Sequence, residues 1–218
     1  MRTLAVLPVK RFELAKTRLG GALAPDARAA LAQAMVADVL DELLGSAVLD
    51  GVVVVTNETP VVALAQAVGA RALRDPHESG QSAAALVGIE QAIADGYERV
   101  LLVPGDCPAL DGAALEALLR AAAPAPSVTA VADRHGQGTN ALLLAPPAVI
   151  EPGFGPGSLE RHRARAAASG AAWRTVELPG LLLDIDTADD LAALRAAQSR
   201  LGELEALHRK DRERAHQR

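Results

Sequence analysis

Short apolar runs alternate with longer Ala- and Leu-rich stretches along most of this 218-residue chain. Residues 52–56 are dense in valine, and β-branched side chains suit a strand that is buried on both faces. Residues 26–44 instead carry apolar side chains four apart, beginning at Leu31 and Met35, which is the spacing of an amphipathic helix. This alternation predicts an α/β fold with a mainly parallel sheet covered by helices on both faces.

The same patterns predict where each element lies. In the first half we expect strands at residues 3–9, 52–56, 71–75 and 99–103, and helices at 26–44, 60–68, 82–95 and 112–123. In the second half we expect strands at 128–132, 140–145, 173–178 and 181–185, a helix at 158–169 and a final helix from Thr187. Ligands of such sheets bind at the carboxyl ends of the strands, so the loops after the strands are the places to search for a site.

Composition limits the class of protein. Half of the residues are apolar and 22% are charged, which fits one globular domain; we expect it over residues 1–200, followed by a charged tail over 201–218. A net charge of −5 argues against a nucleic-acid binder, and no apolar run approaches the roughly 18–20 residues of a membrane span. One cysteine, Cys107, excludes an intramolecular disulfide, and no signal peptide is recognisable, so a cytoplasmic location is expected.

Three aspartates are candidates for a metal site. Asp106 follows a predicted buried strand, where a carboxylate can hold a hard cation, although it could also be a turn residue that bonds its own backbone. Asp184 and Asp186 are two apart at the predicted end of a strand and would project to the same side. Residues 187–190 also match a helix capping box, which accounts for Thr187 and Asp186 but leaves Asp184 unexplained.

A second candidate is a basic loop. Lys10, Lys16 and Arg18 follow the first predicted strand, ahead of a Gly20-Gly21 pair. A phosphate-rich ligand at the strand ends would need such cations, and arginine adds a planar fork for phosphate oxygens. The alternative is a solvated basic turn, and a P-loop is excluded because no Walker pattern is present.

Two glycine-containing loops lie in the second half. The loop over residues 133–140 is either a hairpin connection or a place where Gly136 and Gly138 let backbone amides approach a ligand. The loop over 154–158 opens a helix, so that Ser158 is either a helix cap or part of an anion site. Cys107 has no clear base partner and is interpreted as a packed residue. His162, between Arg161 and Arg163, is interpreted as lying on a solvated face.

Five stretches of sequence match one family in the same order. They are Pro8-Val9-Lys10 with Ala15-Lys16-Thr17-Arg18-Leu19; Gly105-Asp106-Cys107-Pro108; Asp133-Arg134 with Gly138-Thr139-Asn140; Phe154-Gly155 with Ser158; and Asp184-Ile185-Asp186-Thr187. Over Val6 to about Leu194 the chain thus resembles the 2-phospho-L-lactate guanylyltransferases, a family that includes the phosphoenolpyruvate guanylyltransferases. The family acts in making the deazaflavin coenzyme F-420.

The resemblance implies a fold and a set of site residues. The fold would be a three-layer α/β/α sandwich of the nucleotide-diphospho-sugar transferase type. Three groups of residues carry over by position: Asp106, Asp184 and Asp186 as ligands of Mg2+; Thr139, Gly155 and Ser158 as the grip on the substrate's carboxylate; and Lys10, Lys16 and Arg18 as the catalytic cations that meet the nucleotide phosphates. The family's Gly-Leu-Asn-type segment appears here as Gly80-Gln81-Ser82, a departure that leaves the base-contacting residues unassigned.

The reaction implied by the resemblance is transfer of GMP from GTP to phosphoenolpyruvate, with 2-phospho-L-lactate as the alternative acceptor. Because the product would be a reactive diphosphate ester, hand-over to the next pathway enzyme is a further hypothesis. A metal-dependent glycosyltransferase is a more distant alternative because Asp184-Ile185-Asp186 is also an Asp-x-Asp pattern, but this pattern lies near the C-terminus. A non-catalytic nucleotide-binding regulator is the third hypothesis, which the presence of all three aspartates disfavours. Guanylyl transfer is therefore the predicted function.

Overall fold

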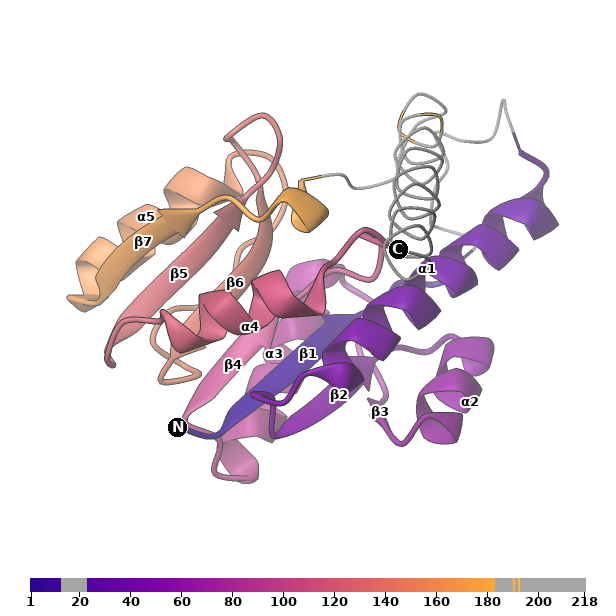
Figure 1. Ribbon diagram of the computed structural model, residues 1–218, viewed down its shortest axis with the longest axis horizontal. Coiled ribbons are helices and arrows are strands. Elements are labelled where there is room, and N and C mark those ends of the chain that lie inside the picture. Colours follow the sequence, from indigo (N-terminus) through magenta and orange to yellow (C-terminus); the bar gives the residue numbers. More distant parts are fainter. Residues whose placement is uncertain (13–22, 183–189, 191, 193–218) are drawn as a thin grey trace, which may run out of the picture.

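The computed structural model describes residues 1–12, 23–182, 190 and 192 of the chain. Within this part, seven strands form one sheet in the order β3-β2-β1-β4-β6-β5-β7 (Figure 1). The strands are β1 (Thr3–Pro8), β2 (Gly51–Val55), β3 (Arg71–Leu73), β4 (Arg99–Leu102), β5 (Ser127–Ala132), β6 (Thr139–Ala145) and β7 (Ala172–Val176). The helices are α1 (Pro25–Gly45), α2 (Thr59–Ala67), α3 (Gln81–Ala94), α4 (Gly112–Arg120) and α5 (Ser158–Ser169).

The sheet is mainly parallel, as predicted. β1 pairs in parallel with β2 and β4, β2 with β3, and β5 with β7. β6 is antiparallel to both of its neighbours, β4 and β5. Consequently the other described strands all end at one edge of the sheet, and β6 begins at that edge.

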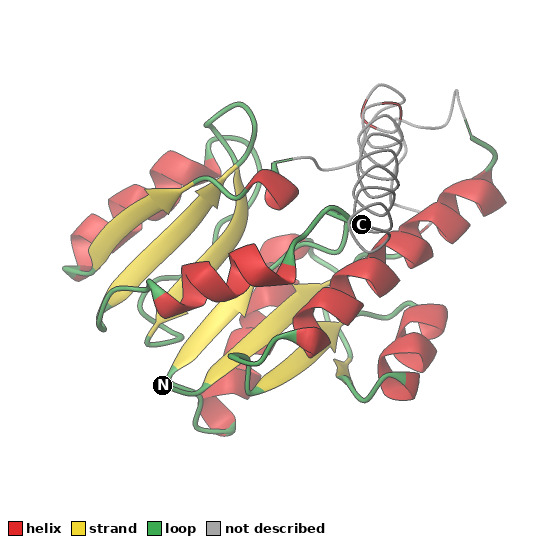
Figure 2. Cartoon of the chain, in the orientation of Figure 1, coloured by secondary structure: helices red, strands yellow, loops and turns green. Residues whose placement is uncertain are grey.

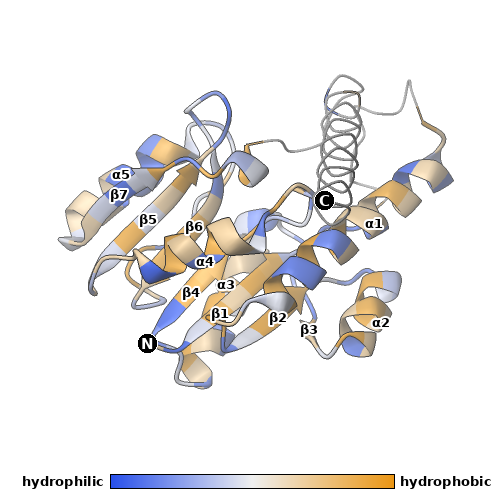
Figure 3. Cartoon of the chain, viewed as in Figure 1, coloured by the Kyte–Doolittle hydropathy of each residue, from blue (hydrophilic) through white to orange (hydrophobic). Residues whose placement is uncertain are grey.

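Helices cover both faces of the sheet, which gives three layers (Figure 2). In β1, Ala5 and Leu7 pack into the core beneath α1, α2 and α4, whereas Leu4 and Val6 pack into the core beneath α3 and α5. This period of two is what a strand with two buried faces requires. Figure 3 shows the apolar residues along the central strands, while α5 carries many hydrophilic residues.

The predicted elements recur with shifts of a few residues at their ends, and the helix at Ser158–Ser169 has the predicted bounds. The prediction of a strand over residues 181–185 is wrong for its first two residues, Leu181 and Leu182. There, Pro179–Leu181 forms a 3-10 helix, η3, and Leu182 has right-handed helical backbone angles. Proline fixes its own φ near the helical value, so Pro179 favours this turn over an extended chain. Residues 183–185 lie outside the described residues.

The prediction of one domain over residues 1–200 and a charged tail over 201–218 stays a prediction, because residues 193–218 lie outside the described part. The same holds for the final helix expected from Thr187. Of the helices that the structure describes, none is long and apolar enough to cross a membrane.

Candidate active site

The carboxyl edge of the sheet gathers the loops that carry the predicted site residues. Lys10 follows β1, Asp106 follows β4, Asp133 follows β5, and Thr139 opens β6. Parallel sheets bind their ligands at this edge because loops and helix N-termini converge there. The order of the strands therefore brings together residues that are up to about 130 positions apart in the sequence.

The turn that carries Asp106 packs closely against the end of β1. A Cβ atom added at Gly105 would lie 3.1 Å from Cγ2 of Val36 and 3.3 Å from Cγ2 of Val9, so a larger residue would fit there only if these valines moved slightly. Cys107 is fully buried, which confirms that it is a packed residue. Asp106 is half-buried and follows directly after this tight contact.

Backbone bonds and side-chain carboxylates hold the start of the basic loop. The amide of Val9 donates to the carbonyl of Val55 (2.9 Å), and the amide of Phe12 donates to Oε2 of Glu58 (2.7 Å). Between them, Nε of Arg11 donates to Oε1 of Glu78 at 2.7 Å. Lys10, which lies between these hydrogen-bonded residues in the sequence, is exposed. The other two predicted cations, Lys16 and Arg18, lie outside the described residues.

Thr139, Ser158 and His162 form a buried polar cluster at the start of β6 and α5. Ser158 Oγ donates to Thr139 Oγ1 at 3.2 Å, and Nδ1 of His162 lies 3.0 Å from the same oxygen. The three residues are 7%, 1% and 0% exposed, respectively. The structure thus brings together the two hydroxyl residues predicted to grip the substrate's carboxylate.

The interpretation of His162 as a solvated side chain is wrong. Although Arg161 and Arg163 flank it, His162 lies one helical turn after Ser158, and residues four apart share a face of a helix. Both side chains contact Oγ1 of Thr139 at the start of β6, and the imidazole is fully buried. Burial, reinforced by the charges of Arg165 and Arg161, lowers the pKa of His162 to about 4. The imidazole is therefore neutral near pH 7.

The loop before α5 completes this cluster. The amide of Gly153 donates to Nε2 of His162 at 2.8 Å, and the ring of Phe154 meets the imidazole edge-on with a centroid distance of 5.4 Å. Gly155 has φ of 104°, a conformation that favours glycine, and its carbonyl accepts the amide of Ser158 at 3.1 Å. All three predicted carboxylate-binding residues, Gly155 included, are therefore neighbours.

The alternative that Ser158 caps α5 is wrong. The N-cap is Gly157, in the left-handed region with φ of 67°, and no side chain caps this helix. Because its backbone is already helical, Ser158 is free to turn its hydroxyl toward Thr139. Its side chain thus belongs to the polar cluster and not to the helix end.

The loop after β5 is the hairpin connection between β5 and β6, and it is organised around the carboxylate of Asp133. The amides of His135 and Gln137 donate to Oδ1 of Asp133 at 3.1 and 2.9 Å. Burial raises the pKa of Asp133, but the backbone bonds from Gln137, Gly138 and His135 outweigh it, so the pKa lies below its usual value. The amides of this loop therefore bond the loop's own aspartate.

Two contacts tie the last described segment to the carboxyl edge. Nδ2 of Asn140 donates to the carbonyl of Leu181, and Sγ of Cys107 lies 4.0 Å from the same oxygen. Further along, the guanidinium of Arg134 pairs with the buried carboxylate of Asp190. Asp184 and Asp186 fall between these two anchor points in the sequence but lie outside the described residues.

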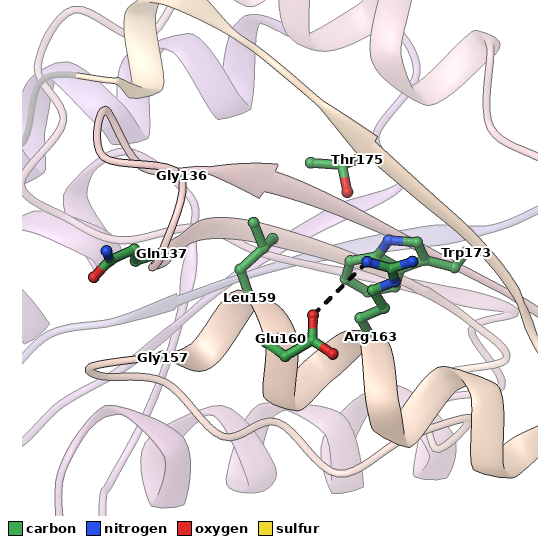
Figure 4. Close-up of a pocket in the computed structure, with 8 residues that line it drawn as sticks. All are labelled: Gly136, Gln137, Gly157, Leu159, Glu160, Arg163, Trp173 and Thr175. Atoms are coloured by element: carbon green, nitrogen blue, oxygen red, sulfur yellow. Dashed lines mark ion pairs between the residues drawn. The ribbon is translucent and has the colours of Figure 1, made fainter.

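No group of three His, Cys, Asp or Glu side chains that could hold a metal is found in the part of the chain that the structure describes. Of the three predicted ligands, Asp106 is the one within that part. A pocket of about 350 Å³ lies between α5, β7 and the loop after β5 (Figure 4). Trp173, Arg163 and Glu160 contribute to its lining, and so does Gly136, one of the glycines expected to let backbone amides approach a ligand. Among the described residues, Asp106, Thr139 and Ser158 do not line it.

Comparisons with known proteins agree on guanylyl transfer. A family described as "Guanylyl transferase CofC like" matches residues 3–198. A phosphoenolpyruvate guanylyltransferase from Conexibacter woesei is 47% identical over 196 residues, which cover 89% of this chain and 88% of that protein. One from Sphaerobacter thermophilus is 39% identical, with 89% and 93% covered. A 3-phospho-D-glycerate guanylyltransferase from Phenylobacterium zucineum is 36% identical, with 85% and 86% covered.

Solved structures share the fold. A nucleotidyl transferase from Methanothermobacter has a TM-score of 0.68 at 19% identity, with 92% of this chain and 99% of that chain covered. A CMP:2-keto-3-deoxy-manno-octonic acid synthetase in complex with CTP has a TM-score of 0.62 at 18% identity, with 92% and 99% covered. At such identities the likeness concerns the arrangement of helices and strands, and it agrees with the predicted nucleotide-diphospho-sugar transferase type.

Proposed function

Since this chain belongs to the CofC-like guanylyl transferase family, we propose that it transfers the guanylyl group of GTP to phosphoenolpyruvate and releases pyrophosphate. Family membership makes the chain a nucleotidyltransferase and favours this reaction over sugar transfer. The relatives from Conexibacter and Sphaerobacter carry the name of this activity at 47% and 39% identity. The proposed pathway is the biosynthesis of the deazaflavin coenzyme F-420.

The observation that carries the proposal is the hydroxyl pair of Thr139 and Ser158 beside Gly155. The two oxygens are 3.2 Å apart at the carboxyl edge of the sheet. Hydroxyls and backbone amides can donate to a carboxylate without adding a full charge of their own. Such a site suits an acceptor with a carboxylate at one end and a phosphate at the other.

The nucleotide is proposed to bind on the β1 side of the same edge. Lys10 is exposed there on a loop that its neighbours hold in place. α3 begins after Gly80, whose φ is 104°, and its first turn is not capped by a side chain. The unpaired amides of a helix start favour anions such as phosphates. Lys16 and Arg18 are proposed to add charge to the same group.

Mg2+ is proposed as the cofactor, with Asp106, Asp184 and Asp186 as ligands. Carboxylates supply the oxygen ligands that Mg2+ prefers, and substrate phosphates commonly complete its coordination. Sγ of Cys107, the residue after Asp106, lies 4.0 Å from the carbonyl oxygen of Leu181. Asp184 follows Leu181 by three residues, which supports the proposal that it and Asp106 bind the same ion. When bound, Mg2+ would offset the negative charge that gathers between two phosphorylated substrates.

The chemistry asks the chain mainly to position two anions. A phosphate oxygen of the acceptor attacks the α-phosphorus of GTP; one P–O bond forms, the bond to the β-phosphate breaks, and pyrophosphate leaves with the electron pair. In this proposal Thr139, with Ser158 beside it, binds the acceptor's carboxylate, and Lys10, exposed after β1, shields the leaving group. Holding both reactants in line removes most of the entropic barrier.

The identity of the acceptor is tested by incubating the protein with GTP, Mg2+ and one phosphorylated acid and measuring the pyrophosphate that is released. Phosphoenolpyruvate, 2-phospho-L-lactate and 3-phospho-D-glycerate are compared, the last because of the Phenylobacterium relative. The highest kcat/KM is expected with phosphoenolpyruvate. A preference for another acid would correct the acceptor, and no pyrophosphate with any of them would refute guanylyl transfer.

A pair of matched variants tests the role of Asp106. Asp106→Asn removes the charge of a proposed ligand and is expected to abolish nearly all turnover. Asp111→Asn, five residues later, removes the same charge at the N-cap of α4, where asparagine can still accept the bond from Ala113. It should retain activity. Equal turnover by the two variants would show that the carboxylate of Asp106 is not needed for catalysis.

A further inference from the structure

The hydrogen bond from the backbone fixes which nitrogen of His162 carries a proton. The amide of Gly153 is a donor in every protonation state, and it points at Nε2 from 2.8 Å. Nε2 must therefore be the unprotonated nitrogen that accepts this bond. In the neutral ring the proton then resides on Nδ1, which donates to Thr139 Oγ1 over 3.0 Å.

This tautomer decides how many protons the cluster can offer to a ligand. Nδ1 of His162, Thr139 and Ser158 together carry three protons, and the two contacts between them use two. One hydroxyl proton is left over. If Nε2 carried the ring proton instead, Nδ1 would accept from Thr139, both hydroxyl protons would be used within the cluster, and none would remain.

The direction of the hydrogen bond between the two hydroxyls indicates which of them offers the remaining proton. Ser158 is 1% exposed and Thr139 is 7% exposed. Ser158 also donates inward to Thr139, so Thr139 accepts from two sides and its own O–H is directed elsewhere. The polar atoms of the cluster thus present a donor, not an acceptor, at the carboxyl edge.

We propose that His162 is a positioning residue for the acceptor: by donating from Nδ1 it turns the hydroxyl of Thr139 into a hydrogen-bond donor for the acceptor's carboxylate. The inference rests on the proposed function for the identity of that ligand. In this role His162 acts through Thr139, whose hydroxyl oxygen lies 3.0 Å from Nδ1. Phe154, packed edge-on against the imidazole, and Gly153 keep the ring in the required orientation.

The tautomer is measured in the free protein. With 15N-labelled histidine, the ring nitrogens of His162 should show Nδ1 protonated and Nε2 unprotonated at neutral pH, with the signals assigned by their loss in His162→Gln. The proton on Nε2, or rapid exchange between the two forms, would overturn the inference without reference to any substrate.

Two variants separate positioning from packing. His162→Phe keeps a ring of similar size but removes both nitrogens, whereas His162→Gln keeps an acceptor for Gly153 and a donor for Thr139. The KM for phosphoenolpyruvate should rise roughly tenfold or more in the Phe variant and recover most of that loss in the Gln variant. The KM for GTP should stay within about twofold in both. Equal increases in both KM values, with no recovery in the Gln variant, would mean a purely structural role.

Binding without transfer keeps this test apart from that of the proposed function. Calorimetric titration of phosphoenolpyruvate, with Mg2+ present and no GTP, should detect binding to the wild type and the Gln variant and clearly weaker binding to the Phe variant. Equal binding by all three proteins, or by none, would overturn the inference. If binding follows the expected order but the wild type releases no pyrophosphate, the proposed function fails while the role of His162 stands.

Discussion

The backbone amide of Phe154 donates a hydrogen bond to Oγ of Ser82 at 2.9 Å, a contact between residues 72 positions apart. Ser82 lies in the first turn of α3, and Phe154 precedes Gly155 in the loop proposed to hold the acceptor. The proposed nucleotide side and the proposed acceptor side of the site are therefore joined directly. Loss of this bond should affect acceptor binding, because Phe154 also packs against His162.

We therefore expect Ser82→Ala to weaken acceptor binding. The variant leaves the half-buried amide of Phe154 without its partner, at a cost of about 1–3 kcal/mol. The KM for phosphoenolpyruvate should rise several-fold, measured by pyrophosphate release at saturating GTP. Ser79→Ala is the matched control, because that hydroxyl bonds the nearby carbonyl of His77 on the exposed surface. Identical acceptor KM values for the two variants would show that the Ser82 contact is not needed.

Gly180 of η3 packs directly against the backbone of Ala109, and we expect Gly180→Ala to displace that segment. An added Cβ would lie 2.1 Å from the carbonyl oxygen of Ala109, a backbone atom that cannot swing aside. The shift should cost about 1–3 kcal/mol and lower kcat/KM, since Leu181 next to it contacts Cys107 beside Asp106. Thermal denaturation and turnover would be measured together. Unchanged values for both would contradict this close packing.

Gly88 lies where α3 crosses β1, and we expect Gly88→Ala to destabilise the fold. The added Cβ would meet Cγ1 of Val6 at 2.2 Å, and a valine buried on a strand has little room to turn. The expected loss is about 1–3 kcal/mol in the free energy of unfolding, measured by urea denaturation. Gly45→Ala at the end of α1 is the control, because its Cβ meets nothing within 4 Å.

The double variant Gly88→Ala/Val6→Ala gives this prediction a second test. Removing the two methyl groups of Val6 makes room for the new Cβ, so the double variant should be more stable than the sum of the single effects implies. Simple additivity of the two losses would show that Gly88 and Val6 do not compete for the same space.

The strands and helices could be predicted because their side-chain periods are strong. Valine-rich residues 52–55 suit a strand buried on both faces, and the helix at Ser158–Ser169 is bounded by Gly157 and Gly170 in the sequence. η3 could not be predicted from the sequence, since the apolar run Leu181-Leu182-Leu183 after Pro179 also fits a strand. Contacts between segments that are distant in the sequence determine the backbone conformation there, and Gly180 packs against the backbone of Ala109.

The site was predicted in part. The resemblance named Thr139, Gly155 and Ser158, which the structure brings together, while Lys16, Arg18, Asp184 and Asp186 lie outside the described residues and stay predictions. His162 was missed because its two arginine neighbours suggested a solvated face. The signal that could have found it was its spacing of four from Ser158, which places both on one face of the helix.

The buried imidazole of His162 leads to a last prediction, on the stability of the fold in acid. Its pKa is about 4 in the folded protein and 6.5 in the unfolded chain, so between these values the unfolded chain binds more protons. Stability therefore rises with pH across this window: it is lost as the pH falls from about 6.5 toward 4, by up to about 3 kcal/mol, and this contribution is constant above 6.5.

Urea denaturation of the wild type and of His162→Gln at several pH values between 4 and 7.5 isolates this contribution, because carboxylates that titrate in acid affect both proteins alike. The difference in unfolding free energy should shift in favour of the Gln variant as the pH falls, since glutamine has no proton to exclude from the buried site. Arg161 and Arg165 stay charged throughout and keep opposing protonation of the ring. A difference that is independent of pH would mean that His162 takes up its proton as readily in the folded protein as in the unfolded chain, and its enclosure between α5, β6 and Gly153 would then have to be reconsidered.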